Sequence, residues 1–242
     1  MRLLIIRHGD PDYEVDGLTE KGKREVKLLA ERLYAREKID HFYVSTYGRA
    51  RKTAEPTLEK FHAKAEICDW LHEFDYHVDW EEGNDASLAW DILPRIWTAK
   101  ESLFHHDAWF EEPYLKASGI KEHFDYVTGK MDEVLHAHGY DRKGYYYEAR
   151  ESNTETLAFF CHFGVEVVLL SHLLNIAPAP LWQGTVALPT GITELVTEER
   201  EKGIAYFRMN RFGDVAHLTE NGEPLSFAAR FCEVYDDFSQ RH

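Results

Sequence analysis

The sequence predicts an α/β fold in three layers, with helices on both faces of a mainly parallel central sheet. Two features carry this prediction. Continuous apolar runs at residues 3–6 and 157–161 are typical of strands that are covered on both faces. Each run ends at a basic or imidazole side chain and leads on to apolar residues at helical spacing. The alternation of strand and helix stops between about residues 74 and 150, so we expect a single domain over residues 1–242 with a largely helical insertion there.

The elements before the insertion follow from local signals. The first apolar run forms the first strand, and Thr19 can cap a helix that runs to about residue 36. A second strand is expected at residues 42–45 and a short third strand at residues 65–68. A helix lies between these two strands, and we expect Pro56 to kink or restart it.

The insertion and the segments after it complete the prediction. The insertion is rich in aromatic and acidic residues, and helical stretches are expected near residues 86–110 and 119–138. The second apolar run then passes through Gly164 into a helix with an apolar face. Residues 192–196 and 205–209, separated by a turn of Glu, Lys and Gly, predict an antiparallel hairpin.

The charge of the chain limits its partners. The 242 residues include 28 Lys and Arg against 43 Asp and Glu, which gives a net charge of −15. Such a surface repels the phosphate backbone, and we therefore expect no nucleic-acid partner. An anionic substrate must be held by a few positioned cations.

Other features bear on the compartment. Three cysteines without a CxxC pair favour a reducing cytoplasm over a disulfide framework or a cysteine zinc site. The first apolar run is too short for the core of a signal peptide. The most apolar stretch, residues 157–174, is interrupted by His162, Glu166 and His172, so we expect no membrane span. A cytoplasmic protein is the prediction.

Basic and imidazole side chains stand at three junctions between a strand and the following helix. Arg7 and His8 occupy the first junction, Arg49 the second and His162 the third. The carboxyl ends of parallel strands gather at one crevice, into which the following helices point their positive N-termini. Guanidinium groups suit phosphate oxygens, while one histidine can attack phosphorus and another can neutralise charge. The sequence therefore predicts a phosphate site.

At these positions the chain resembles the histidine phosphatase superfamily, also called phosphoglycerate mutase-like. The resemblance covers residues 1–73 and 155–218, and it rests on an ordered set of motifs, which is more specific than any one tripeptide. The set comprises Arg7-His8-Gly9, Leu18-Thr19-x-x-Gly22, Ser45-x-x-x-Arg49-Ala50-x-x-Thr53-Ala54, Leu71-x-Glu73 and a strand that ends at His162.

The resemblance implies a role for each matched residue. His8 would be the nucleophile that forms a phosphohistidine, while Arg7, Arg49 and His162 hold the phosphoryl group. Glu73 would protonate the leaving oxygen and later deprotonate the attacking water. In that case His8 must be neutral, His162 is most useful as a cation and Glu73 must start protonated. We expect no metal and no cofactor, because these side chains supply the positive charge.

Several residues have competing interpretations. Four other acids near Glu73 are alternative general acids: Asp69, Asp75, Glu81 and Glu82. The histidines of His105-His106 and His136-x-His138 are expected on solvated helix faces, because no carboxylate spacing completes a zinc site. The aromatic residues of the insertion are expected to form its own core, with a substrate-covering role for some as the alternative. Close packing explains Gly22, in the first turn of a helix, better than helix propensity does.

The residues after Arg7-His8-Gly9 distinguish two reactions. The cofactor-dependent mutases of the family usually carry Ser and a Trp-Asn pair here, whereas this chain has Asp10-Pro11-Asp12-Tyr13. If Gly9, Asp10 and Asp12 lie at the mouth of the pocket, each carboxylate repels a second substrate anion by about 1–4 kcal/mol. We therefore expect a phosphomonoester hydrolase, a metal-independent histidine acid-type phosphatase that acts on a small phosphorylated metabolite. A mutase-type phosphotransferase and a non-catalytic phosphate-binding module are the alternatives.

Overall fold

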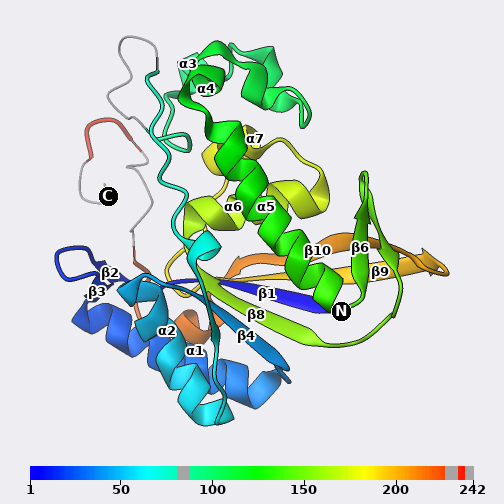
Figure 1. Ribbon diagram of the computed structural model, residues 1–242. Helices are drawn as coiled ribbons and strands as arrows, with labels where there is room; N and C mark the ends of the chain where they lie inside the picture. Colours follow the sequence, from blue (N-terminus) through cyan, green and yellow to red (C-terminus); the bar gives the residue numbers. More distant parts are fainter. Residues whose placement is uncertain (81–87, 227–233, 238–242) are drawn as a thin grey trace.

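A computed structural model describes residues 1–80, 88–226 and 234–237. Over these residues the chain forms an eight-stranded sheet with the order β5-β4-β8-β1-β9-β10-β7-β6 (Figure 1). The strands are β1 (Arg2–Arg7), β4 (His41–Ser45), β5 (Glu66–Cys68), β6 (Tyr140–Lys143), β7 (Tyr146–Ala149), β8 (Thr156–Cys161), β9 (Ile192–Glu201) and β10 (Ile204–Asp214). Strands β5, β4, β8 and β1 pair in parallel, and the other strands extend the sheet by antiparallel pairing. The predicted α/β fold is confirmed.

One face of the sheet is covered by α1 (Glu20–Arg36) and α2 (Gly48–Phe61). Their apolar residues pack on the side chains of β1, β4 and β8 that point to this face. Thr19 caps α1 as predicted, since its Oγ1 accepts a hydrogen bond of 3.0 Å from the Gly22 N–H. Of the two outcomes expected at Pro56, a kink or a restart, the restart is wrong, because α2 is one continuous helix with buried residues on both sides of the proline.

The opposite face is covered by α5 (Ile120–Ala137), α6 (Phe163–Leu174) and α7 (Pro178–Gly184), which completes three layers (Figure 1). Helix α6 follows β8 directly and is buried on almost every side, because its segment contains few polar residues. The hairpin of β9 and β10 is confirmed, and its register pairs Phe207 with Thr197. Two short strands, β2 (Pro11–Asp12) and β3 (Gly17–Leu18), form a separate hairpin after β1.

The segment at residues 74–150 differs in part from the prediction. The helical stretch expected near residues 86–110 is, in its described part, broken into three short helices: α3 (Pro94–Trp97), η2 (Glu101–Phe104) and η3 (Trp109–Glu111). After them come α4 (Pro113–Ser118) and the predicted helix, now α5. The β6–β7 hairpin, which the sequence analysis missed, joins the sheet at β10.

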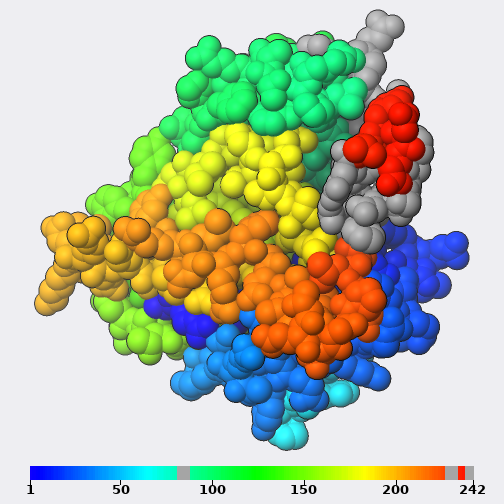
Figure 2. Space-filling model, turned by 180° about the vertical axis from the view of Figure 1, so that it is seen from behind, coloured from blue at the N-terminus to red at the C-terminus, as the bar shows by residue number. Residues whose placement is uncertain are grey.

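The aromatic residues of this segment pack against the rest of the fold. Trp109 is 1% exposed, and its ring lies 5.1 Å from that of Phe124 and 6.1 Å from that of Trp182 in α7. The expected separate core is therefore wrong, because these aromatics belong to the larger core that also contains α6 and the sheet. Figure 2 shows the green segment stacked on the yellow one, and the orange C-terminal segment, with α8 (Ala216–Thr219), against the blue N-terminal helix. Among the described residues, no helix has the length and apolar character needed to span a membrane.

Candidate active site

Four side chains from three strand-to-helix junctions lie at the carboxyl end of the parallel strands. Arg7 ends β1 and His8 follows it, Arg49 lies in the first turn of α2, and His162 directly follows β8. Their exposed fractions are 3%, 1%, 9% and 0% in that order. The imidazole rings of His8 and His162 lie 5.1 Å apart between centroids. The parallel pairing of β1 with β8 places the two histidines side by side, as the junction pattern predicts.

The geometry of His8 favours a neutral imidazole with its proton on Nδ1. Its Nδ1 lies 2.8 Å from the Gly9 carbonyl oxygen, and because a carbonyl only accepts, Nδ1 carries the proton. Nε2 is then left with its lone pair. Burial, followed by the charges of Arg7 and Arg49, lowers the pKa of His8 well below its usual value.

His162 is oriented by a hydroxyl group. Its Nε2 lies 2.9 Å from Ser45 Oγ, at the end of β4, while its Nδ1 has no hydrogen-bond partner among the described residues. Burial, then the proximity of His8 and the two arginines, lowers the pKa of His162 well below its usual value. The protein alone therefore favours a neutral imidazole, in contrast to the cation expected from the sequence. A phosphate dianion beside the ring would act in the opposite direction and raise that pKa.

The two arginines are held by different partners. Arg7 donates from Nη1 to the Ala187 carbonyl oxygen at 2.6 Å. Arg49 donates from Nη1 to Asp16 Oδ1 at 2.8 Å, and its guanidinium lies 4.6 Å from the centre of the Tyr47 ring. These contacts fix both guanidinium groups before any anion binds, which lowers the conformational entropy that binding costs.

Glu73 sits at the N-terminus of α6. Its Oε1 accepts hydrogen bonds from the backbone N–H groups of Phe74 at 2.9 Å, Gly164 at 2.8 Å and Val165 at 3.3 Å. No described residue makes a hydrogen bond with Oε2, which leaves that oxygen for a proton. Burial raises the pKa of Glu73 and outweighs the opposing influence of Arg7 and of these hydrogen bonds. Of the described competitors, Asp75 is exposed, and Asp69 is exposed and accepts a hydrogen bond from Tyr126; Glu81 and Glu82 lie outside the described residues.

Two glycines of the site are required by close approach. A Cβ on Gly164 would lie 2.7 Å from Glu73 Oε1 and 3.0 Å from Trp90 Nε1, so a larger residue would displace the carboxylate. A Cβ on Gly22 would lie 2.4 Å from the Asp10 carbonyl oxygen. Close packing, as the sequence analysis inferred, explains Gly22.

The structure gives the residues after His8 other partners. Gly9 is buried, and its N–H donates to Thr53 Oγ1 at 2.9 Å. The Asp10 carboxylate accepts hydrogen bonds from Thr19, at 2.6 Å, and from Ser226. Asp12 accepts a bond of 3.1 Å from the Glu14 N–H. Asp10 therefore anchors the loop to the cap of α1, and its predicted action on a substrate at the pocket mouth has no support in these contacts.

Several residues that position this site had no role predicted from the sequence. Asp16 holds Arg49 and also accepts a 2.5 Å bond from the Gly48 N–H. Ser45 and Thr53 were noted only as motif letters, although they orient His162 and the backbone beside His8. Glu166, noted only as an interruption of an apolar run, is completely buried in α6. A charged residue inside an apolar helix was the available signal for Glu166.

Comparisons with known proteins agree with this geometry. The sequence matches the family described as "Histidine phosphatase superfamily (branch 1)" over residues 3–210. No curated protein sequence matches the chain.

Solved structures provide matches at the level of the fold. A phosphoserine phosphatase from Entamoeba histolytica, in complex with 3-phosphoglyceric acid, has a TM-score of 0.57 at 15% identity, covering 90% of this chain and 98% of that one. A mycobacterial glucosyl-3-phosphoglycerate phosphatase has a TM-score of 0.57 at 18% identity, covering 88% and 98%. The alpha-ribazole phosphatase from Shigella flexneri has a TM-score of 0.54 at 18% identity, covering 89% and 97%.

Proposed function

Because the chain belongs to the histidine phosphatase superfamily, we propose that it hydrolyses phosphomonoesters of small metabolites through a phosphohistidine on His8. One observation carries the proposal: a buried imidazole whose Nδ1 is bound to a carbonyl oxygen presents Nε2 beside two arginines and a second histidine. This is the arrangement that in-line attack on phosphorus requires. The three structural neighbours named above are phosphatases of small phosphorylated molecules, which supports the substrate class.

The first step transfers the phosphoryl group to the enzyme. Nε2 of His8 attacks phosphorus, and the bond between phosphorus and the ester oxygen breaks. Arg7 and Arg49 stabilise the charge on the phosphoryl oxygens, and His162 adds a further donor. The proton on Oε2 of Glu73 moves to the leaving oxygen, so that an alcohol departs and Glu73 becomes a carboxylate. The Gly9 carbonyl stabilises the positive charge that develops on the His8 ring.

The second step returns the enzyme to its starting state. The Glu73 carboxylate removes a proton from a water molecule, whose oxygen attacks phosphorus as the bond to Nε2 breaks. Inorganic phosphate leaves, His8 is neutral again and Glu73 is again protonated. The backbone N–H groups around Oε1 hold the carboxyl group in place through both proton transfers.

Further features of the predicted enzyme belong to this proposal. Each step is assigned to side chains of the chain, so the phosphatase requires no metal and no cofactor. We interpret residues 74–150 as an insertion within a single domain. Its Trp90 donates from Nε1 to the Phe74 carbonyl oxygen at 3.0 Å, beside Glu73, so in this mechanism the insertion lies next to the leaving group. We place the reaction in the cytoplasm, a compartment that suits the free, buried thiols of Cys68 and Cys161.

The test combines labelling with turnover. Wild type and His8→Ala are incubated with ³²P-labelled phosphomonoesters, and the label on the protein is checked for loss in acid and survival in base. We expect labelling and phosphate release with the wild type and neither with His8→Ala. Lys130→Ala, on the outer side of α5 where the Lys130 side chain is 35% exposed, is the matched control and retains both.

Each alternative gives a different result. Labelling without release to water would show a phosphate-binding module in place of a phosphatase. Transfer from a bisphosphate to 3-phosphoglycerate that is faster than hydrolysis of every monoester would show a mutase. Turnover by His8→Ala at the wild-type rate would refute the phosphohistidine.

A further inference from the structure

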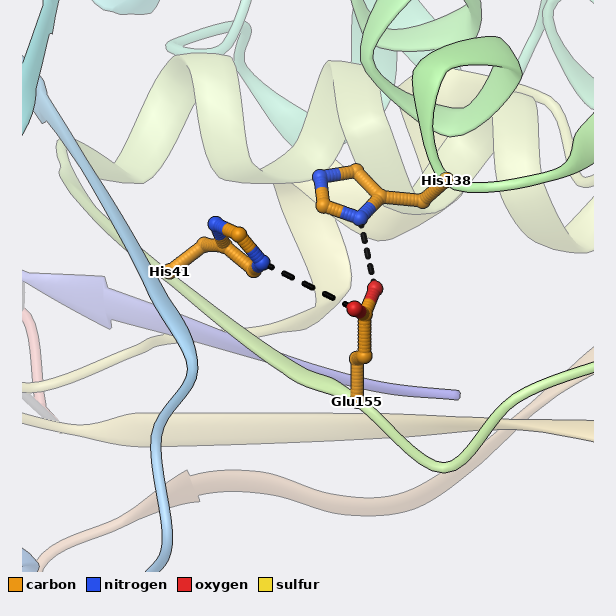
Figure 3. A group of neighbouring side chains, drawn as sticks. All are labelled: His41, His138 and Glu155. Atoms are coloured by element: carbon orange, nitrogen blue, oxygen red, sulfur yellow. Dashed lines mark hydrogen bonds and ion pairs between the residues drawn. The ribbon is translucent and has the colours of Figure 1, made fainter.

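Three potential metal ligands from distant parts of the sequence meet at the other end of the parallel strands. His41 is the first residue of β4, His138 is the residue that caps the C-terminus of α5, and Glu155 directly precedes β8. Figure 3 shows the Glu155 carboxylate facing both imidazole rings. His138 Nδ1 lies 2.7 Å from Glu155 Oε2 and His41 Nε2 lies 3.8 Å from Glu155 Oε1. One ligand atom from each residue lies within 4.8 Å of the other two.

We propose that His41, His138 and Glu155 bind one divalent transition-metal ion, with zinc the best match. Two imidazole nitrogens and one carboxylate oxygen are ordinary zinc ligands, and water can supply the fourth position. Imidazole also suits cobalt and nickel, which can serve as probes, whereas magnesium and calcium prefer sites made of oxygen alone. No metal was expected at His138, because no carboxylate spacing near it in the sequence completes a zinc site, whereas His41 and Glu155 come from distant segments.

The distances fit a small adjustment of the side chains. Zinc lies about 2.0–2.2 Å from nitrogen and oxygen ligands, so donor atoms in a tetrahedral site are about 3.4 Å apart. The two distances from the Glu155 carboxylate lie on either side of that value. The side chains of His41 and Glu155 are 45% and 39% exposed and can rotate, while that of His138 is 11% exposed and provides a fixed ligand.

Tyr43 completes the environment of His138. In the metal-free protein His138 Nδ1 carries the ring proton and donates a hydrogen bond to Glu155, because a carboxylate only accepts. When the ion binds, the ring proton would lie on Nε2 and be donated in a hydrogen bond to the Tyr43 hydroxyl, 3.1 Å away, which leaves the lone pair of Nδ1 for the metal. His138 and Glu155 would then share the ion in place of their hydrogen bond. Asn153 donates to the His138 carbonyl oxygen at 2.8 Å and fixes the backbone.

The surroundings admit an ion from solution. The three residues line a surface cavity of about 720 Å³, together with His136 and Arg150. The charge of Arg150 is paired with Asp141 at 2.7 Å, and the same carboxylate also binds His136 Nδ1. These partners keep Arg150 and His136 occupied, so His136 is the matched control for a surface imidazole in this cavity.

The position of the site indicates a structural role. A parallel strand rises about 3.3 Å per residue, so the path along β8 from Glu155 to His162 spans roughly 20 Å. An ion here is too distant to touch the phosphate site. It would join the C-terminus of α5 to the starts of β4 and β8, which stabilises the folded state because the unfolded chain does not hold the three ligands together.

The experiment measures metal binding by the full-length protein after treatment with EDTA. Zn²⁺ is titrated by calorimetry and Co²⁺ by its visible absorption, and unfolding in urea is followed with and without Zn²⁺. We expect one ion per chain, a four-coordinate Co²⁺ spectrum, and an unfolding equilibrium constant that falls about 100-fold when free Zn²⁺ is 100 times Kd. His41→Ala, His138→Ala and the isosteric Glu155→Gln should each weaken binding at least tenfold, whereas His136→Ala should leave it unchanged.

The outcomes separate this site from the phosphatase site. Stoichiometric binding that is lost in Glu155→Gln but kept in His136→Ala supports the proposal even if no phosphatase activity is found. No binding, or binding that is equal in wild type and all four variants, would overturn it. Binding that His136→Ala weakens as much as the ligand variants would also overturn it, because that result describes a general attraction of surface histidines for the metal.

Discussion

Replacing Glu166 with Gln should change how the stability of the protein depends on pH. The Glu166 side chain is completely buried in α6. Its Oε1 accepts a hydrogen bond from Thr193, and its Oε2 has no partner among the described residues. Burial raises the pKa of Glu166 to about 8, even though Thr193 and the charge of Arg7 act against that shift. The folded protein therefore carries a neutral carboxylic acid at this position at neutral pH.

The expected magnitude follows from the difference between the folded and unfolded pKa. In the unfolded chain the ordinary value is 4.5, so between pH 4.5 and about 8 the folded state holds a proton that the unfolded state has lost. The contribution of Glu166 to stability is fully present below the unfolded pKa and is lost as the pH rises towards the folded pKa. Between pH 6 and pH 8 this group should raise the unfolding equilibrium constant roughly 50-fold, which corresponds to roughly 2 kcal/mol.

The assay is urea unfolding at several pH values, followed by tryptophan fluorescence, for wild type and Glu166→Gln. The difference between their free energies of unfolding isolates Glu166, because the buried histidines titrate in both proteins. In Glu166→Gln the amide N–H groups would be buried without an acceptor, so the variant is expected to be less stable than wild type at pH 6. The quantity that tests the prediction is how the difference between the two free energies of unfolding changes from pH 6 to pH 8. Glu133→Gln, on the exposed face of α5, controls for the loss of a negative charge.

The pH dependence of the stability difference between wild type and Glu166→Gln decides whether the pKa of Glu166 is raised. If the stabilities of wild type and Glu166→Gln run parallel from pH 6 to pH 8, the folded protein does not hold the extra proton. If wild type loses roughly 2 kcal/mol more stability than Glu166→Gln between pH 6 and pH 8, the result supports the raised pKa of Glu166. Glu133→Gln should remain parallel to wild type over the same range.

The remaining predictions concern the site and its supports. Glu73→Gln should lower the single-turnover rate of His8 phosphorylation about 10²–10⁴-fold for alkyl phosphates but much less for p-nitrophenyl phosphate, whose leaving group needs no proton; equal losses of that rate for both substrates would contradict the role as general acid. Gly164→Ala places a Cβ 2.7 Å from Glu73 Oε1, so kcat for alkyl phosphates should fall while rapid-quench assays still detect labelling of His8 by p-nitrophenyl phosphate. Thr19→Ala removes the cap of α1 and should cost about 1 kcal/mol in urea unfolding, with Thr219→Ala, exposed at the end of α8, as a neutral control.

The parts of the structure that were predictable are those with local signals. Continuous apolar runs predict the buried strands, and the N-cap residue and the apolar face predict α1. The convergence of His8, Arg49 and His162 then follows from parallel pairing, since each residue comes directly after a strand or opens the helix that follows it. No knowledge of the rest of the chain is needed for this step.

The parts that were missed depend on contacts between distant segments. Asp16 lies 33 residues from Arg49, and nothing in its own neighbourhood indicates an arginine partner. The segment near residues 86–110 contains residues that favour helix, but its tryptophans pack into the main core and the chain turns repeatedly to bring them there. His41, His138 and Glu155 are brought together by the pairing of β4 with β8 and by the end of α5.

The proposed phosphate site is compatible with a net charge of −15, because burial disfavours the ionised form of the buried acids near its cations. Burial raises the pKa of both Glu73 and Glu166, the two acids whose charge acts on Arg7. Glu166 in its neutral form adds no negative charge that would oppose the field of Arg7, and the raised pKa of Glu73 acts in the same direction. Asp16 does pair with Arg49, but its side chain is 44% exposed, so water screens its charge more than the charges inside. The local potential at His8 is therefore decided by which groups are ionised there, and the total charge of the protein has little effect on it.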